Sequence, residues 1–203
     1  MVETTGMVKD LRVLVTAGAS GIGLAIAQTF AREGAQLHIC DISEEALTDC
    51  AIAHPDWGIT NCDVSQEVQV AQLFEDVSRQ MGGLDVLINN AGIAGQTGGI
   101  EELSIDKWRQ TIDINLNGQF YCARLAVPML KQSDNASIIC LSSVAGRLGY
   151  AYRTPYAVTK WAIVGLIKSL AIELGPQGIR VNALLPGIVE GPRIEQVISA
   201  RAK

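Results

Sequence analysis

Short apolar runs rich in β-branched residues alternate along this chain with longer segments of helical periodicity. The short runs predict strands at residues 12–16, 36–40, 58–62, 86–89, 137–142 and 179–185. The longer segments predict helices at residues 21–33, 43–53, 65–81, 104–132 and 155–174. We expect the 104–132 helix to bend near Asn115 and Gly118. Strands that alternate with helices indicate right-handed βαβ units, so we predict an α/β fold, a doubly wound parallel sheet with helices on both faces.

The length and composition are those of one globular domain. The 203 residues are enough for a substantial core, and no repeat or low-complexity linker divides them. Hydrophobic residues make up 48% and charged residues 18%, which is ordinary for a globular protein. We therefore predict a single domain over residues 1–203, in which residues 1–8 form a flexible tail.

Charge and hydropathy exclude several classes of partner. The net charge is −5, and no cluster of basic residues offers a surface to nucleic acid or to an anionic membrane. No apolar run approaches the roughly 20 residues of a membrane-spanning helix. The opening MVETTGM lacks the basic start and the apolar core of a signal peptide. We expect neither a nucleic-acid partner nor a membrane partner.

The cysteines and histidines give no sign of a metal site. The cysteines are odd in number, and their spacing matches no metal motif. Cys40 and Cys140 fall in apolar runs, where cysteine packs as a small hydrophobic residue. His38 alternates within a predicted strand, and neither it nor His54 has ligand partners nearby. We expect no bound metal, and reduced thiols indicate the cytoplasm. The cysteines are Cys40, Cys50, Cys62, Cys122 and Cys140.

A glycine-rich turn lies between the first predicted strand and the first predicted helix, in VTAGASGIGLAIAQTFAREG. Glycine allows a positive φ and lets main-chain N–H groups approach a phosphate, whose charge then lies at the helix N-terminus. Because the turn follows a strand and opens a helix, we predict that it binds the pyrophosphate of a dinucleotide. The residues expected at the phosphates are Gly18, Ser20, Gly21, Ile22 and Gly23.

Asp41 ends the second predicted strand and indicates which dinucleotide is bound. A carboxylate at this place can accept hydrogen bonds from both ribose hydroxyls of adenosine, and it repels a 2′-phosphate. Its neighbours Ser20, Ile42 and Ser43 carry no positive charge that would hold such a phosphate. The pattern favours NAD over NADP. The alternative is that Asp41 is a simple turn or helix-cap residue.

Tyr156 and Lys160 are four residues apart in TPYAVTK, so they share one face of a predicted helix. An isolated phenol ionises near pH ~10, and a neighbouring ammonium favours the ionised form. The pair therefore brings a tyrosine proton donor and acceptor closer to neutral pH. Ser143, upstream of Tyr156, can add a hydrogen bond to a carbonyl or alkoxide at the same point.

Seven separated motifs occur in order along nearly the whole chain. They are the turn at 16–23, Asp63-Val64, Asn89-Asn90-Ala91-Gly92, Asn115, Ser143, Tyr156-x-x-x-Lys160 and Pro186-Gly187. In these motifs the chain resembles the short-chain dehydrogenase/reductase family. The resemblance implies a Rossmann-like fold and an oxidoreductase that transfers hydride between NAD(H) and the CH–OH or C=O group of a small alcohol or ketone.

The resemblance also implies a role for each matching residue. Tyr156 would be the catalytic acid/base, and Lys160 would favour its ionisation and bind the nicotinamide ribose. Ser143 would orient the substrate oxygen, and Asn115 would hold a water that links Lys160 to solvent. Asn90 would stabilise the sheet centre beside the cofactor. The remaining expected cofactor contacts, the last three of them around the nicotinamide, are Asp63, Val64, Ala91, Gly92, Pro186, Gly187 and Ile188.

Three of these candidates also have a purely structural interpretation. Asp63, at the end of the third predicted strand, could equally cap the helix expected near Ser65. Asn115 could bond a main-chain group and bend its helix. Ser143 could cap a turn.

The chain departs from the family pattern at three places. Ala17 stands where the family's turn has its first glycine, and we expect Gly18 to supply the flexibility through a slightly shifted loop. Gly191 stands where the family commonly has threonine, so a hydroxyl contact to the cofactor is absent or supplied elsewhere. Residues 187–203 resemble the start of a substrate-covering segment, and the family's seventh strand is missing. We therefore expect a chain truncated after Lys203.

The substrate is the least determined feature. Arg147, Arg153 and Arg193 could pair with an acidic group of a substrate, but a solvated surface arginine is the more ordinary interpretation of each. The expected pocket residues form a mixed apolar set: Ile93, Ala94, Val144, Ala145, Tyr150 and Ile188.

Two other functions stay open, and an oligomer is expected. One alternative is an NADP-dependent 3-oxoacyl or other carbonyl reductase, and the other is a nucleotide-binding regulator without turnover. The helices at 104–132 and 155–174 carry apolar residues beyond one stripe, and the resemblance implies that they pair across an interface. We expect a homodimer or homotetramer. The apolar residues include Leu125, Val127, Ile163 and Leu166.

Overall fold

The fold is built on one parallel sheet. The computed structural model describes residues 8–191, 195 and 198–199, and the predicted tail at 1–8 lies outside this part except for its last residue. Six strands pair in the order β3-β2-β1-β4-β5-β6, and every pairing is parallel. Their bounds are β1 (Arg12–Thr16), β2 (Gln36–Asp41), β3 (Gly58–Asn61), β4 (Val86–Asn89), β5 (Ser137–Leu141) and β6 (Arg180–Leu184).

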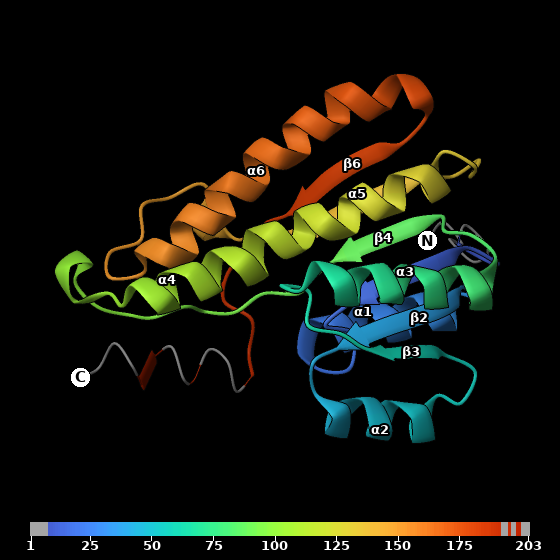
Figure 1. Cartoon of the computed structure of the whole chain (residues 1–203), viewed down its shortest axis with the longest axis horizontal. Coiled ribbons are helices and arrows are strands. Elements are labelled where there is room, and N and C mark those ends of the chain that lie inside the picture. The colour runs from blue at the N-terminus through green and yellow to red at the C-terminus, as the bar shows by residue number, and fades with distance from the viewer. Residues whose placement is uncertain (1–7, 192–194, 196–197, 200–203) are drawn as a thin grey trace, which may run out of the picture.

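Helices cover both faces of this sheet, as Figure 1 shows. One face carries α1 (Gly21–Arg32) and α2 (Glu44–Ala53), and the other carries α3 (Glu67–Met81), α5 (Gly118–Leu130) and α6 (Thr154–Leu174). A further helix, α4 (Ile105–Ile112), leads into α5. The prediction of a doubly wound parallel sheet is therefore confirmed. Strands β2 and β3 are added on one side of β1, and β4, β5 and β6 are added on the other. The switch point lies between β1 and β4, where such sheets form a crevice for ligands.

The strand and helix boundaries differ little from the prediction, except in two helices. The helix expected to start at residue 65 starts at Glu67. The helix expected over 104–132 is divided into α4 and α5 by a π-helical segment, η2 (Asp113–Asn117). A π-turn widens the helix by one residue and often marks a functional site. The structure thus has a π-helical segment at the place where the sequence predicts a bend near Asn115 and Gly118.

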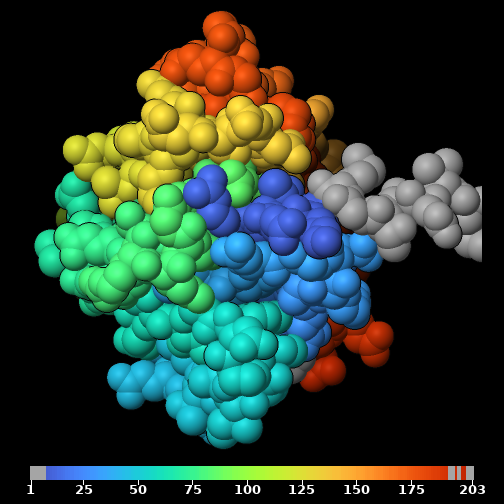
Figure 2. Space-filling view, turned by 90° about the vertical axis from the view of Figure 1, so that its right-hand side faces the viewer, coloured from blue at the N-terminus to red at the C-terminus, as the bar shows by residue number. Residues whose placement is uncertain are grey.

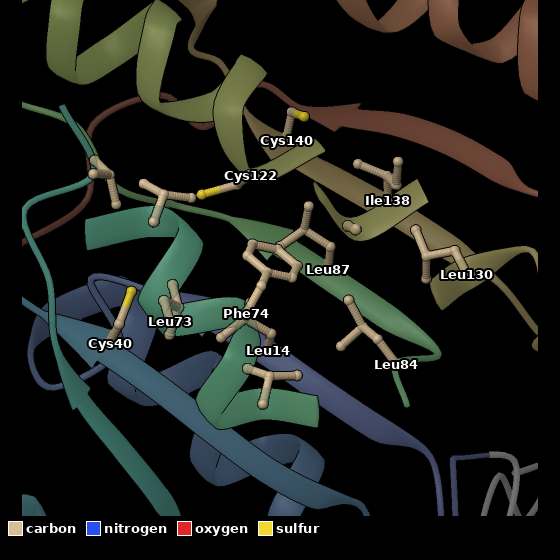
Figure 3. Close-up of a cluster of buried hydrophobic side chains, with 14 of the residues drawn as sticks. Leu14, Cys40, Leu73, Phe74, Leu84, Leu87, Cys122, Leu130, Ile138 and Cys140 are labelled. Carbon is tan, nitrogen blue, oxygen red and sulfur yellow. The ribbon is translucent and has the colours of Figure 1, made fainter. Parts of the chain in front are cut away.

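Two buried clusters hold the helices against the sheet. The larger one joins strands β1, β4 and β5 to α3, α5 and α6, and Figure 3 shows its strand residues Leu14 and Leu87 beside Phe74 of α3. The smaller cluster joins the opposite faces of the same strands to α1 and α2. Burial of both faces explains why the strands contain continuous apolar runs instead of an alternating pattern.

Some residues expected elsewhere belong to this core. Ile163, predicted at an oligomer interface, has no exposed surface and packs inside the larger cluster, so that part of the prediction is wrong. Leu125 and Val127 also pack against the cluster while staying partly exposed. All five cysteines are buried and unpaired, as expected for cysteines that serve as small hydrophobic residues.

Arg12 and Asp85 clamp the amino-terminal ends of β1 and β4 together. The Arg12 guanidinium donates two hydrogen bonds to the carboxylate, at 2.9 Å and 2.8 Å, and the Arg12 main-chain N–H donates a third at 2.9 Å. Gly83 leaves room for this pair, because a Cβ there would lie 2.0 Å from Arg12 Nη1. Figure 2 shows this amino-terminal end of the sheet, where the chain colours follow the strand order from orange at the top to cyan at the bottom.

The Arg12–Asp85 pair is expected to stabilise the fold at neutral pH. Hydrogen bonds from Arg12 lower the pKa of Asp85 from 3.8 to about 2. Because the folded pKa lies below the unfolded one, the stabilisation is present above pH ~4 and is lost as the pH falls toward 2. Asp85→Asn should lower the free energy of unfolding by about 1–2 kcal/mol at pH 7.

Urea denaturation at pH 7 and at pH 3 would measure this effect, which should be smaller at the lower pH. Asp106→Asn is a matched control, because Asp106 forms an exposed ion pair with Arg109 at 3.5 Å and should change stability by less than ~0.5 kcal/mol. An equal loss for both variants at pH 7 would contradict the assignment of Asp85 as a clamp.

Candidate active site

The glycine-rich turn connects β1 to α1 at the carboxyl end of the sheet, and it uses a left-handed residue that the sequence analysis assigned differently. Ala17 itself adopts φ 49°, and Gly21 adopts φ 51°, whereas Gly18 does not take a positive φ. The expectation that Gly18 supplies the left-handed flexibility is therefore wrong. Ala17 bears the strain of this conformation, which costs roughly 1–2 kcal/mol in a residue with a Cβ.

Gly18 and Gly23 are needed for close packing instead. A Cβ on Gly18 would lie 2.8 Å from Ile39 Cβ and 2.9 Å from the Val15 carbonyl oxygen. A Cβ on Gly23 would lie 2.0 Å from the Ala17 carbonyl oxygen. The turn can therefore fold back tightly on the first turn of α1, which leaves Ser20, Gly21 and Ile22 exposed.

The N-terminus of α1 fits an anion. Its N-cap, Ser20, makes no side-chain capping hydrogen bond, and the first turn of α1 within the described chain carries no acidic residue. The main-chain N–H groups of this first turn therefore face no acidic side chain of α1 itself. A pyrophosphate would meet both N–H donors and the positive end of the helix dipole here.

Asp41 lies at the end of β2 beside this turn. One carboxylate oxygen accepts a hydrogen bond from Ala19 N at 3.3 Å, and the other accepts one from Ser43 N at 3.1 Å. Asp41 is therefore in part a turn residue, as the alternative interpretation states, whereas the helix cap of α2 is Ser43. A carboxylate has about four acceptor sites, so two bonds to main-chain N–H groups leave capacity for ribose hydroxyls.

Asp63 follows β3 and is mainly engaged with its own loop. Its Oδ1 accepts hydrogen bonds from Ser65 N at 2.9 Å and from the Ser65 hydroxyl at 2.8 Å. These bonds form a turn that precedes α3, so Asp63 does not cap that helix directly. Its neighbour Val64 is buried and lies where a Cβ on Gly118 would be 2.8 Å away. Val64 therefore packs under α5 behind the expected adenine site.

The ends of β1 and β4 are tied together by Thr16, a residue to which the sequence analysis gave no role of its own. The Thr16 hydroxyl accepts hydrogen bonds from Asn90 N and Ala91 N, both at 3.0 Å. The Asn90 side chain donates in return to the carbonyl oxygens of Thr16 at 2.9 Å and Ala17 at 3.0 Å. These four bonds hold the glycine-rich turn against the start of the loop after β4.

Asn115 lies in the π-helical segment and is fully buried. Its side chain accepts a hydrogen bond from Ile93 N at 2.7 Å, and it donates to Ile93 O at 3.0 Å and to the Thr159 hydroxyl at 3.1 Å. The bonds to main-chain groups agree with the structural interpretation of Asn115. They also connect the loop after β4 with α6. Thr159 was not singled out from the sequence, although its place one residue before Lys160 was a signal.

Lys160 extends from α6 to the end of β5. Its Nζ donates to the Leu141 carbonyl oxygen at 2.7 Å and lies 5.5 Å from the centroid of the Tyr156 ring. A Cβ on Gly92 would lie 3.6 Å from this Nζ and 3.1 Å from Asn115 Oδ1. The structure therefore brings Tyr156, Lys160, Asn115 and Gly92 together.

The two serines after β5 have different surroundings. Ser142 donates to the Lys160 carbonyl oxygen at 2.7 Å and so helps to hold α6 against the sheet. Ser143 accepts from Ala145 N at 3.2 Å and approaches the Pro186 carbonyl oxygen at 3.5 Å. Ser143 thus caps a turn, as its alternative interpretation stated, and it also lies beside Pro186, whose neighbours Gly187 and Ile188 are exposed.

The buried thiol of Cys140, which interacts with Asn89 and Lys160, stays neutral. Asn89 lies beneath the site and donates to the Gln119 carbonyl oxygen at 3.0 Å and to Cys140 Sγ at 3.8 Å. Burial raises the pKa of Cys140 to about 11, although Asn89 and Lys160 oppose the rise. Cys140 therefore offers no thiolate near neutral pH that could compete as a base.

Comparison with known proteins identifies the family of this chain. Residues 11–202 match the family described as short chain dehydrogenase. The chain belongs to the short-chain dehydrogenase family. Among curated members, the 2-dehydro-3-deoxy-L-rhamnonate dehydrogenase (NAD(+)) of Sphingomonas sp. (strain SKA58) is 36% identical over 184 residues, which cover 91% of this chain and 74% of that protein.

Two further members extend the comparison. The trans-4-hydroxycyclohexanecarboxylate dehydrogenase of Sinomonas cyclohexanicum is 37% identical over 202 residues, which cover 95% of this chain and 77% of that protein. The crystal structure of levodione reductase superposes with a TM-score of 0.89 at 32% identity, covering 95% of this chain and 77% of that one. The chain is therefore an oxidoreductase of the short-chain dehydrogenase family.

Arg153 is the residue that the sequence analysis placed least well. It was expected as a solvated surface arginine, but it is only 3% exposed, so that expectation is wrong. Its Nη2 donates to the Ala94 carbonyl oxygen at 3.0 Å, beside the Tyr156 ring. Arg147 is exposed as expected, and Arg193 lies outside the described residues.

Within the described part of the chain, no group of three or more His, Cys, Asp or Glu residues is arranged to hold a metal ion. No helix there is long and apolar enough to cross a membrane.

Removal of the strained Cβ at Ala17 should stabilise the short-chain dehydrogenase fold. Ala17→Gly should raise the free energy of unfolding by about 1 kcal/mol, because glycine adopts the left-handed conformation without a clash. Ala25→Gly, at an exposed position inside α1, should lower it by roughly 0.5–1 kcal/mol. Urea denaturation would measure both changes, and a loss of stability in both variants would contradict the strain at Ala17.

Proposed function

We propose that the protein is an NAD(H)-dependent oxidoreductase that transfers hydride between the cofactor and the CH–OH or C=O group of a small alcohol or ketone. The observation that supports this most is that Lys160, on the same helix as Tyr156, reaches the carboxyl end of β5, the strand that Ser143 follows. There the Lys160 Nζ is held 5.5 Å from the Tyr156 ring centroid by its bond to Leu141 O. The site lies at the carboxyl ends of the strands, where doubly wound folds bind ligands.

In this proposal Tyr156 moves the proton. The tyrosinate accepts the proton of the substrate hydroxyl as the carbinol hydrogen leaves as hydride, and in reduction the phenol returns a proton to the alkoxide. Lys160 lies beside this ring, with its Nζ 5.5 Å from the ring centroid. The Ser143 hydroxyl hydrogen-bonds the substrate oxygen and keeps it within reach of Tyr156. When bound, the nicotinamide supplies the hydride acceptor or donor.

The proposed cofactor contacts follow the crevice from the adenine end to the nicotinamide end. Asp41 and Asp63 would lie at the adenosine, and the turn at Gly18–Gly23 would hold the pyrophosphate. Lys160 would bind the nicotinamide ribose. The residues proposed around the remainder of the dinucleotide are Val64, Asn90, Ala91, Gly92, Tyr156, Pro186, Gly187 and Ile188.

Asn115 is proposed to support a proton path from Lys160 to solvent. Its amide group already makes three hydrogen bonds to Ile93 and Thr159. We therefore assign the water contact to the Asn115 main-chain carbonyl, which lies in a π-helical segment with altered main-chain pairing. The side chain then fixes the position of that carbonyl relative to Lys160.

The preference for NAD is supported by charge. Asp41 would repel a 2′-phosphate, and no basic residue follows it in the turn. One relative is named as an NAD(+) enzyme, which agrees with this preference. An NADP-dependent carbonyl reductase remains the second candidate, and a nucleotide-binding regulator without turnover is the third.

The substrate class is proposed as a small hydroxy compound, with or without an acidic group. Named relatives act on a sugar-acid derivative and on a ring alcohol with a carboxylate. A useful pair of probes is trans-4-hydroxycyclohexanecarboxylate and cyclohexanol, because they differ by the carboxylate. A strong preference for the carboxylate compound would support an arginine such as Arg147 near the substrate. Equal turnover of the two compounds would contradict an arginine that binds the carboxylate.

An assembly of identical chains in the cytoplasm is proposed. Buried, unpaired thiols agree with a reducing compartment. Phe120 on α5 and Val158 and Trp161 on α6 are large apolar side chains that remain 42–48% exposed. Such residues on neighbouring helices suit an interface between copies. A sedimentation mass equal to one chain would contradict the assembly.

Tyr156→Phe should abolish most of the activity. Loss of the phenolic proton donor should lower kcat by about 10²–10⁴-fold, while NAD affinity should fall far less because phenylalanine keeps the ring. Nicotinamide absorbance with a panel of alcohols and both cofactors would measure turnover. Tyr152→Phe is the matched control, since this side chain is 61% exposed. Wild-type protein that binds NAD but turns over nothing in the panel would favour the regulator instead.

Asp41→Ala should shift the cofactor preference toward NADP. Loss of the charged acceptor should weaken NAD use by about 10- to 100-fold, and NADP use should rise because a repulsive charge is removed. Asp49→Ala, at an exposed position of α2, should leave the ratio of the two activities unchanged. If Asp41→Ala lost activity equally with both cofactors, Asp41 would be a turn residue only.

A further inference from the structure

Arg153 is a buried cation at a place where a cation is unfavourable. It is the N-cap residue of α6, and its side chain is only 3% exposed. The positive end of a helix dipole lies at the N-terminus and repels a cation. Burial of a charge adds a further cost unless partners compensate it. The contacts of Arg153 should therefore matter enough to offset both costs.

Those contacts lie on the residues that frame the candidate active site. The Arg153 Cζ is 5.0 Å from the centroid of the Tyr156 ring and 5.5 Å from the centroid of the Tyr150 ring. Its Nη2 donates to the Ala94 carbonyl oxygen at 3.0 Å. A guanidinium suits this combination, because its plane packs on aromatic faces while its edge donates hydrogen bonds.

The segments joined by Arg153 are also tied to each other through the main chain. Gly98 N donates to the Tyr152 carbonyl oxygen at 3.0 Å, and Tyr152 adopts a left-handed φ of 61°. A Cβ on Gly95 would lie 3.6 Å from Pro155 Cβ. The loop after β4 therefore packs directly on the segment that leads into α6. Arg153 supplies the side-chain link between this loop and the Tyr156 ring.

We propose that Arg153 is a positioning residue that holds the Tyr156 phenol in the orientation needed for proton transfer and couples it to the loop after β4. Lys160 and Arg153 then contact the same ring, with Lys160 Nζ at 5.5 Å and Arg153 Cζ at 5.0 Å from its centroid. Lys160 is fixed by β5 through Leu141, and Arg153 is fixed by the loop after β4 through Ala94. The two cations that contact the Tyr156 ring are thus each hydrogen-bonded to the main chain after a different strand, β4 or β5.

This role rests on the proposed function, because it assigns Tyr156 the proton transfer. It differs from the possibility raised by the sequence, in which Arg153 would bind an acidic substrate group. A positioning role predicts equal losses with charged and neutral substrates. An acid-binding role predicts a loss confined to trans-4-hydroxycyclohexanecarboxylate and no loss with cyclohexanol.

Arg153→Met keeps much of the side-chain volume and removes the planar cation. We expect kcat to fall about 10- to 100-fold through misplacement of the phenol, with a smaller change in KM and nearly unchanged NAD affinity. Arg153→Lys should recover only part of the loss, because an ammonium cannot pack as a plane and donate from its edge at once. Arg109→Met, on the exposed side of α4, is the matched control and should leave kcat unchanged.

Chemical rescue separates positioning from a general structural role. Millimolar guanidinium should restore part of kcat in Arg153→Ala and none in Tyr156→Phe. Unchanged kcat in Arg153→Met would overturn the proposal. It would also be overturned if kcat, NAD affinity and the thermal midpoint fell together and guanidinium restored none of them.

A measurement without turnover keeps this test separate from that of the proposed function. In protein labelled with fluorotyrosine, the fluorine NMR signal that is missing in Tyr156→Phe belongs to Tyr156. Arg153→Met should shift and broaden this signal, and guanidinium should sharpen it in Arg153→Ala. A sharp, unmoved signal would overturn the positioning role. Absence of turnover in the wild-type protein alongside a shifted signal would instead reject the proposed function and keep the contact.

Discussion

The parallel direction of the strands is the constraint on which the rest of this structure depends. Because every strand runs the same way, the segments that follow the strands all begin at one end of the sheet, which is formed by the carboxyl ends of the strands. The glycine-rich turn, the loop after β4, the serines after β5 and the Pro186 segment after β6 therefore meet without any sequence proximity. Because helices bury both faces of the sheet, the carboxyl end of the strands is the place where polar groups can gather.

Polar side chains at the carboxyl end of the strands form hydrogen bonds with main-chain groups more than with one another. Thr16 and Asn90 bind main-chain groups across β1 and β4, Asn115 binds Ile93, and Lys160 binds the Leu141 carbonyl oxygen. Main-chain groups at strand ends are rigidly placed by the sheet. Side chains bound to them lose little additional freedom when a ligand enters, which is the basis of a preorganised site.

Much of the fold and the site could be predicted because local patterns carry them. Apolar runs located the six strands of the sheet, and the i, i+4 spacing of Tyr156 and Lys160 placed both on one helix, where the Lys160 Nζ lies 5.5 Å from the Tyr156 ring centroid. The failures have a common cause. Which residue takes the left-handed conformation in the turn, Ala17 or Gly18, depends on the packing of Gly18 against Ile39. The burial of Ile163 and Arg153 likewise depends on neighbours distant in the sequence.

The amino-acid sequence by itself determined the order of strands and helices, the family and the identity of the candidate residues. Periodicity and short motifs are local properties, so they survive without knowledge of packing. Only the tertiary structure decided that Thr16 joins two strand ends, that Asn115 lies in a π-helical segment, and that Arg153 packs on the Tyr156 ring. These features arise from contacts between strand ends, loops and helices that the sheet brings together, and no local pattern encodes such contacts.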